Sequence, residues 1–282
     1  MVKMNGNEIT QEIKAKLTQI EQQKNIRILY ACESGSRAWG FASPDSDYDV
    51  RFVYVRPLSD YLKVKAVPDF LECELNEVYD INGWDLKKFF KQLYKSNPVI
   101  FEWANSPIVY RETPEWERIK AVMNDYVLQV EMFHHYREMG RSNCLLAISA
   151  NEKDKLSRNP SCEDLGRALR GSTGEVVLKK YLYVLRPVLA CLWLMQKHTV
   201  PPTEFSKLVE EVLPVELKVL VDELLAVKMK SGEKEKGARI PQIDSFIETQ
   251  LNEATVFPVS KEEQEDYEKL DNLFLEIVRQ GK

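Results

Sequence analysis

Two aspartates two positions apart are the residues of this sequence best placed to do chemistry. Asp47 and Asp49 stand at the start of the apolar run Tyr48–Val55. Side chains alternate along a strand, so both carboxylates should face the same side. Carboxylates held that close repel each other unless cations neutralise them, and oxygen ligands of this kind select Mg²⁺ or Mn²⁺. The pair therefore predicts a divalent-cation site.

A glycine-serine pair precedes these aspartates at a fixed distance. Gly35-Ser36 follows the apolar run that begins at Arg27, and ten residues, Arg37–Ser46, separate the pair from Asp47. A glycine lets the backbone approach a ligand closely, and the free N–H groups of the next turn, with the Ser36 hydroxyl, suit a phosphate. Alone, a Gly-Ser pair is an ordinary turn and Asp-x-Asp an ordinary strand end. Together they indicate a phosphate site beside a metal site.

The elements that must position these residues are three strands and a helix. Arg27–Ser34 and Tyr48–Val55 are apolar runs typical of buried strands, and Leu71–Ile81 alternates as a third strand would. We expect Gly83 to end that strand and Asp85 to cap the helix that follows.

The character of the sequence changes near residue 112, where long helical patterns replace short strands. We therefore predict an α+β fold. A first domain over residues 1–112 should contain a small mixed or antiparallel sheet with flanking helices, and residues 113–282 should form an all-α helical domain.

Composition narrows the class of protein. The chain has 282 residues, 44% of them hydrophobic, and a net charge of −5 with a pI near 5.5, which argues against tight, unspecific binding of nucleic acid. Five widely spaced cysteines without a CxxC pair indicate reduced thiols. The start lacks a signal or transit pattern and no apolar run is long enough for a bilayer, so we expect a cytoplasmic protein without a membrane segment.

The Gly-Ser pair, the gap and Asp47-Tyr48-Asp49 resemble the signature of the DNA polymerase β superfamily of nucleotidyltransferases. Within this superfamily, the chain resembles the RNA-repair-pathway DNA polymerase β-like family. The resemblance to that family covers roughly residues 25 to 225. Ser34 departs from the apolar residue that the superfamily prefers before the glycine. The matching segments are GSRAWGFASPDSDYDVRFVYVRP, DINGWDLKKFF, KSNPVIFEWANSPIVY and KKYLYVLRPVLACLWL.

The resemblance implies a role for each residue of the signature. Gly35 and Ser36 would bind the NTP phosphates, while Asp47 and Asp49 would bind two Mg²⁺ or Mn²⁺ ions. The superfamily normally adds a third carboxylate on a neighbouring strand, which binds one metal and helps to deprotonate the acceptor. Asp80 is our choice for it. The rivals are Asp85, Glu72 and Glu74.

Five further basic residues are candidates for nucleotide binding. Arg37 follows the Gly-Ser pair and could reach a phosphate. Arg51 shares the face of the two aspartates and either contacts the triphosphate or holds the carboxylates. Lys179, Lys180 and Arg186 lie on one predicted helix of the second domain, where a lysine can neutralise phosphate charge or simply be solvated.

These features together predict a metal-dependent nucleotidyltransferase. It would move NMP from an NTP to a hydroxyl and release pyrophosphate. An RNA 3′ end is the acceptor that the resemblance favours. The alternatives are a small-molecule hydroxyl, a protein hydroxyl and a non-catalytic nucleotide-binding module. The sequence leaves the NTP, the acceptor and the oligomeric state open.

Overall fold

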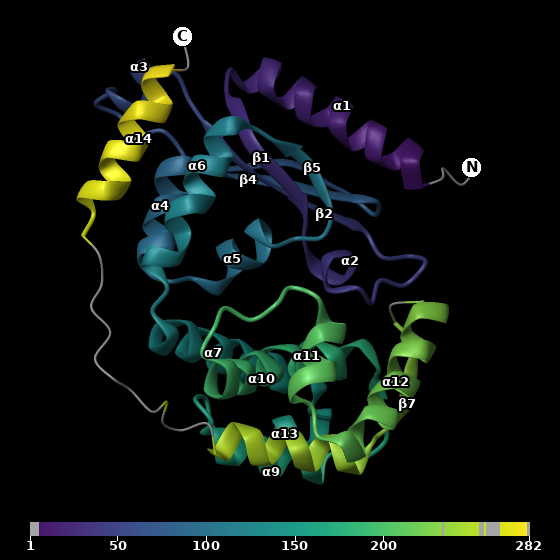
Figure 1. Cartoon of the computed structure of the whole chain (residues 1–282). Helices are drawn as coiled ribbons and strands as arrows, with labels where there is room; N and C mark the ends of the chain where they lie inside the picture. Colours follow the sequence, from purple (N-terminus) through teal and green to yellow (C-terminus); the bar gives the residue numbers. More distant parts are fainter. Residues whose placement is uncertain (1–5, 233, 254–256, 258–265, 281–282) are drawn as a thin grey trace. The chain divides into compact units, whose positions relative to one another are not determined.

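The computed structural model describes residues 6–232, 234–253, 257 and 266–280. By internal packing the chain divides into two compact units, which we describe separately (Figure 1). The first unit comprises residues 1–38, 47–127 and 263–282, and the second comprises residues 39–46 and 128–262. This division does not follow the single predicted boundary at residue 112, because both units draw on separate stretches of the chain.

The first unit is built on a mixed five-stranded sheet in the order β3-β4-β2-β1-β5. β2 pairs in parallel with β4, while the other neighbours pair antiparallel. The predicted α+β sheet domain with flanking helices is thus confirmed. Its strands are β1 (Arg27–Glu33), β2 (Tyr48–Val55), β3 (Phe70–Leu75), β4 (Tyr79–Asp85) and β5 (Val109–Glu112), and its helices are α1 (Gly6–Lys24), α2 (Gly35–Trp39), α3 (Leu58–Tyr61), α4 (Leu86–Tyr94), α5 (Pro98–Ala104), α6 (Pro114–Met123), η1 (Asn124–Tyr126) and α14 (Glu268–Gln280).

Helices cover both faces of this sheet. On one face the apolar stripe of α1, including Leu17, packs with Val50 and Phe52 of β2. On the other face Tyr30 of β1 stacks on Trp116 of α6, with ring centroids 4.1 Å apart. Since Tyr30 and Val53 are register partners, this second face also carries Asp49 and Arg51.

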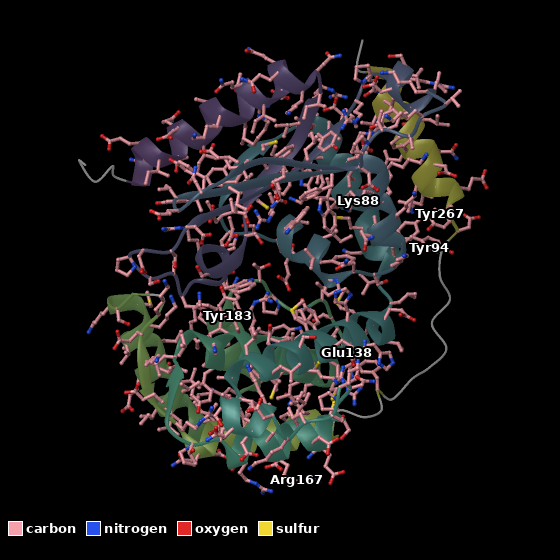
Figure 2. All side chains as sticks on the ribbon, turned by 180° about the vertical axis from the view of Figure 1, so that it is seen from behind. Lys88, Tyr94, Glu138, Arg167, Tyr183 and Tyr267 are labelled. Atoms are coloured by element: carbon pink, nitrogen blue, oxygen red, sulfur yellow. The ribbon has the colours of Figure 1, made fainter. Side chains whose placement is uncertain are left out.

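The last helix of the chain, α14, completes this first unit. Just before it, Tyr267 stacks on Tyr94 of α4 with a centroid separation of 3.7 Å, and both residues are labelled in Figure 2. A second aromatic contact joins Phe274 of α14 to Tyr61 of α3.

The segment predicted as one strand, Leu71–Ile81, is instead the hairpin of β3 and β4, so that prediction was wrong. The side chain of Asn76 accepts hydrogen bonds from the backbone N–H groups of Val78 and Tyr79, both at 2.8 Å, and turns the chain. The strand also continues through Gly83. A side chain there would collide with Phe52, so the glycine allows close packing and does not end the strand.

The second unit is a helical assembly, as predicted, with a small two-stranded ribbon of β6 and β7 added to it. Residues 39–46 belong to this unit, and Phe41 is fully buried in its core, 5.4 Å from the ring of Phe205. In the part of the chain that the structure describes, every helix is too short or too polar to cross a membrane. The elements are α7 (Gln129–Ala147), α8 (Ala150–Lys153), α9 (Cys162–Gly171), β6 (Glu175–Val177), α10 (Lys179–Lys197), α11 (Phe205–Val212), α12 (Val215–Lys230), β7 (Lys236–Ala238) and α13 (Pro241–Glu253).

The packing at Gly83 generates the first prediction. A Cβ atom there would lie 2.2 Å from Cε2 of Phe52 in the middle of the sheet. We expect Gly83→Ala to lower the free energy of unfolding by about 2 kcal/mol, because either strand β4 or the ring of Phe52 must shift to make room for the new Cβ atom. Urea denaturation followed by circular dichroism measures the change. The control is Gly6→Ala, where the added Cβ has no atom within 4 Å. Equal stabilities of the two variants would contradict the packing argument.

Candidate active site

Asp49 and Asp80 face each other across the parallel strands β2 and β4. They are register partners, so both carboxylates lie on the same face of the sheet. Nη2 of Arg51 donates hydrogen bonds to Oδ1 of Asp49 at 2.8 Å and to Oδ2 of Asp80 at 2.7 Å. Nη1 of the same arginine donates to the backbone carbonyl of Asp80 at 2.8 Å. Arg51 therefore holds the two carboxylates together.

The glycine of the Gly-Ser pair lies directly against Asp49. Gly35 has a φ of +57°, a left-handed conformation that glycine adopts without strain. A Cβ atom at this position would be only 2.0 Å from Oδ2 of Asp49. The backbone N–H of Ser34 also donates to the carbonyl of Asp49 at 2.8 Å. The Gly-Ser turn and the second aspartate thus form one compact structure, as the interpretation of the signature requires.

Ser36 and Arg37 continue from this glycine into the short helix α2. Ser36 is almost fully buried, whereas Arg37 is half-buried. Nε of Arg37 donates to the backbone carbonyl of Asp47 at 2.9 Å, and its guanidinium lies 3.8 Å from the ring centroid of Tyr48. Arg37 therefore ties the Gly-Ser turn to the residue that opens β2.

Glu33 is a residue of the site that the sequence interpretation missed. Its side chain is fully buried at the end of β1. One carboxylate oxygen accepts a hydrogen bond from the backbone N–H of Asp49 at 2.9 Å, and the other accepts one from the hydroxyl of Tyr110. The signal in the sequence was a charged residue closing an apolar run, which is also how an ordinary strand end looks.

The electrostatics of the site disfavour additional negative charge. The pKa of Asp49 is raised to about 6, mainly by burial, with the neighbouring carboxylates of Asp47 and Asp80 contributing to the rise and Arg51 opposing it. Burial likewise raises the pKa of Glu33 to about 7, against the lowering effect of its hydrogen bonds from Tyr110 and the Asp49 amide. Such crowded carboxylates are stabilised by added positive charge.

The donor set fits hard divalent cations, because Asp47, Asp49 and Asp80 offer only carboxylate oxygens. Among the described residues, no three His, Cys, Asp or Glu side chains stand already arranged around one metal position. At this site the guanidinium of Arg51 forms ion pairs with the carboxylates of both Asp49 and Asp80.

The rival third carboxylates lie elsewhere in the first unit. Asp85 caps α4, accepting a hydrogen bond from the N–H of Lys87 at 2.9 Å, as the sequence predicted. Glu72 is exposed on the edge strand β3, and Glu74 on the same strand pairs with Lys16 at 2.9 Å. None of the three faces Asp49 across a strand pair, whereas Asp80 does.

Lys179, Lys180 and Arg186 lie on α10 of the helical unit. Nζ of Lys179 is 5.8 Å from the ring of Tyr183, and burial together with nearby cations lowers the pKa of Lys180. Arg186 is buried, with its guanidinium 4.5 Å from the ring of Trp39. These contacts are internal to that unit, and a role of the three residues toward phosphate stays a prediction.

Comparison with known proteins places this chain in a family. The model of the RNA repair pathway DNA polymerase beta family matches residues 9–276. The uncharacterized protein YcgL of Bacillus subtilis (strain 168) is 37% identical over 243 residues, which cover 86% of this chain and 85% of that protein.

Two solved structures show a more distant likeness. Spectinomycin adenyltransferase AAD(9) from Enterococcus faecialis, solved with ATP and spectinomycin, is 10% identical, with a TM-score of 0.42 over 86% of this chain and 98% of its own. A nucleotidyltransferase-like protein from Exiguobacterium sibiricum 255-15 is 11% identical, with a TM-score of 0.32 over 86% of this chain and 74% of its own. The match of the family model over most of the sequence decides the assignment: the chain belongs to the RNA repair pathway DNA polymerase beta family and is a nucleotidyltransferase.

Proposed function

We propose that this protein transfers NMP from an NTP to a hydroxyl acceptor in a metal-dependent reaction that releases pyrophosphate. One observation carries the proposal: the carboxylate of Asp49 lies both opposite Asp80 and against the Gly35 turn. Asp47, Asp49 and Asp80 would hold two Mg²⁺ or Mn²⁺ ions. Bound there, such ions lower the pKa of an attacking hydroxyl and neutralise charge on the leaving pyrophosphate.

The residues around the carboxylates have separate tasks in this proposal. The turn that begins at Gly35 offers backbone N–H groups and the Ser36 hydroxyl to phosphate oxygens. Arg51 offsets the repulsion between the carboxylates of Asp49 and Asp80, and Arg37, which follows the Gly-Ser pair, is our candidate to pair with a phosphate. Glu33 is a positioning residue, because its carboxylate accepts a hydrogen bond from the backbone N–H of Asp49 and so fixes the position of that residue.

An RNA 3′ end is the acceptor that we propose, in keeping with the family to which the chain belongs. The test incubates the protein with each α-labelled NTP, Mg²⁺ or Mn²⁺, and either the RNA or the small-molecule fraction of a cell extract. Label should enter the RNA fraction. Periodate treatment of that RNA destroys the terminal 2′,3′-diol and should abolish labelling. Label that enters small molecules instead, or RNA with an oxidised end, would contradict this acceptor.

The aspartates provide the second prediction. We expect Asp47→Asn with Asp49→Asn to lower labelled NMP transfer by about a thousandfold or more, because positioning and charge neutralisation supply most of the rate. The matched control removes two charges from the exposed face of α12, with Asp222→Asn and Glu223→Gln, and should keep full activity. Transfer at the wild-type rate by the first variant would end the proposal.

The same assay assigns the third carboxylate. Asp80→Asn should fall to the level of the Asp47 and Asp49 variant, whereas Asp85→Asn should keep most of its activity, because an asparagine side chain can also accept the capping hydrogen bond from Lys87. Circular dichroism establishes that each variant is folded. The reverse order of activities would assign the role to Asp85.

The close approach of Gly35 to Asp49 gives the third prediction. Gly35→Ala should lower transfer by about a hundredfold, because the new Cβ displaces the Asp49 carboxylate from its position. Gly40→Ala is the matched control. That glycine also has a positive φ, +87°, but an added Cβ there meets no atom within 4 Å. Similar losses in the two variants would mean that backbone strain, and not the position of Asp49, determines activity.

Glu33 gives the fourth prediction, a dependence of stability on pH. Its pKa is raised to about 7 by burial, so the folded protein binds this proton more tightly than the unfolded chain does. The resulting stabilisation is complete below about pH 4 and is lost as the pH rises through about 7. In Glu33→Gln this titration is absent. The unfolding free energy of wild type relative to the variant should therefore fall by up to about 3 kcal/mol between acidic and neutral pH.

Urea denaturation at several pH values in EDTA measures this difference. Glu72→Gln, an exposed glutamate on β3, is the control and should give a curve parallel to that of the wild type. A Glu33→Gln curve that also runs parallel to the wild type would show that Glu33 does not titrate in this range.

A further inference from the structure

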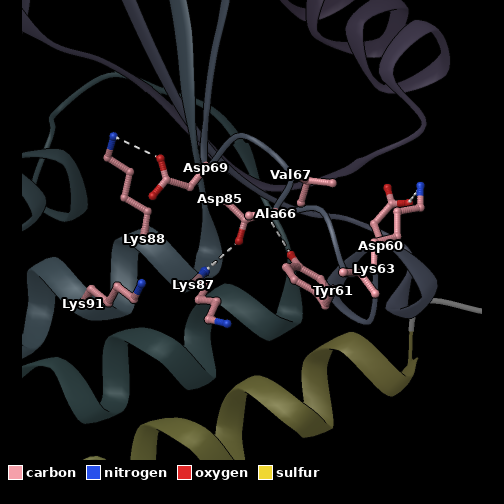
Figure 3. Close-up of a pocket in the computed structure, with 11 residues that line it drawn as sticks. Asp60, Tyr61, Lys63, Ala66, Val67, Asp69, Asp85, Lys87, Lys88 and Lys91 are labelled. Carbon is pink, nitrogen blue, oxygen red and sulfur yellow. Dashed lines mark hydrogen bonds and ion pairs between the residues drawn. The ribbon is translucent and has the colours of Figure 1, made fainter.

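A cavity of about 350 Å³ lies in the first unit, away from the carboxylates of the active site. It is bounded by α3, the segment that leads from α3 to β3, and the start of α4 (Figure 3). Its charged wall carries four lysines and three aspartates: Lys63, Lys87, Lys88, Lys91, Asp60, Asp69 and Asp85.

The aspartates of this cavity already have partners within the unit. Asp60 pairs with Lys63 at 2.6 Å, and Asp69 pairs with Lys88 at 3.6 Å. Asp85 is buried and accepts hydrogen bonds from the Tyr61 hydroxyl and from the backbone of α4, both at 2.9 Å. These are the interactions drawn as dashed lines in Figure 3.

Lys87 and Lys91 supply the positive charge that remains. They are four residues apart on α4, so their side chains project from the same face of the helix. Both are exposed, and neither forms an ion pair with another residue in the described ranges of the chain. Two free ammonium groups about one helical turn apart suit a single anion with several oxygens, such as a phosphate.

The rest of the wall is apolar and has room for more than an inorganic anion. Val64, Ala66 and Val67 line it from the segment after α3, together with the ring of Tyr61. A volume of this size lies in the range of pockets that bind small organic molecules. A ligand with a phosphate at Lys87 and Lys91 would place its organic part on this apolar side.

We propose that this cavity binds a small organic phosphate, held by Lys87 and Lys91 through its phosphate group. The site is separate from the one that holds the nucleotidyltransferase signature. Asp49 pairs with Asp80 near the beginning of β4, whereas Asp85 ends that strand five residues later, opposite Tyr54. At the rise of a strand this is a separation of about 16 Å along the sheet. The cavity is therefore a second ligand site on the same domain.

Titration of the ¹⁵N-labelled full-length protein tests the proposal. The probes are phenyl phosphate and inorganic phosphate, added separately in EDTA at low salt. We expect the amide signals of Tyr61 and of residues 87–91 to shift and saturate, with phenyl phosphate binding more tightly because its ring meets the apolar wall. Lys87→Gln with Lys91→Gln should weaken binding about tenfold or more, since it removes two charge-assisted contacts.

The control variant removes two exposed lysines of the same unit that do not line the cavity, Lys14→Gln and Lys95→Gln. It has the same net charge as the test variant and should bind phenyl phosphate as the wild type does. The proposal is overturned if neither probe shifts these signals, if the test variant binds like the wild type, or if the control variant loses as much affinity. Equal affinity for the two probes would overturn the assignment of an organic ligand.

Discussion

The carboxylate of Asp49 is confined on two sides by the fold. The backbone of the Gly35 turn approaches it so closely that no side chain fits between them, and Arg51 links it to Asp80 on the neighbouring strand. Both constraints act on a group that is already partly removed from water. The local structure therefore fixes where this negative charge lies before any substrate arrives, and the proposed chemistry depends on that preorganisation.

Holding the charge in this way has a cost in stability. The carboxylate of Glu33 is fully buried and that of the neighbouring Asp49 is partly buried, and burial raises the pKa of each. Arg51 and the hydrogen bond from Tyr110 offset only part of that cost. Carboxylates that lie close together repel one another, and bound cations remove this repulsion. The raised pKa values of Glu33 and Asp49 therefore agree with the proposed metal-binding function.

Local patterns in the sequence predicted the elements that surround the site. The apolar run Tyr48–Val55 is β2 residue for residue, and Asp85 caps α4 as expected. The hairpin of β3 and β4 was missed because its turn, Asn76-Glu77-Val78, contains neither glycine nor proline. The turn is made by the Asn76 side chain, which an alternating pattern conceals.

The site itself was only partly predictable from local patterns. Alternation places Asp49 and Arg51 on one face, but it cannot give the register that brings Asp80 opposite Asp49, because that register is a long-range pairing. Glu33 was missed for a similar reason. Its partners are the backbone of Asp49 and the hydroxyl of Tyr110, both distant in sequence.

The interleaving of the two units has a consequence for synthesis of the chain. Residues 39–46, which lie between the Gly-Ser pair and Asp47, pack within the helical unit, and Phe41 is buried in its core. The last helix, α14, belongs to the sheet unit and meets it through the stacked rings of Tyr94 and Tyr267. Because α14 follows the whole helical unit in the sequence, the half that carries the aspartates completes its packing only after that unit has been synthesised. Because each unit consists of separate stretches of the chain, a single proteolytic cut cannot yield a fragment that contains one whole unit and nothing else.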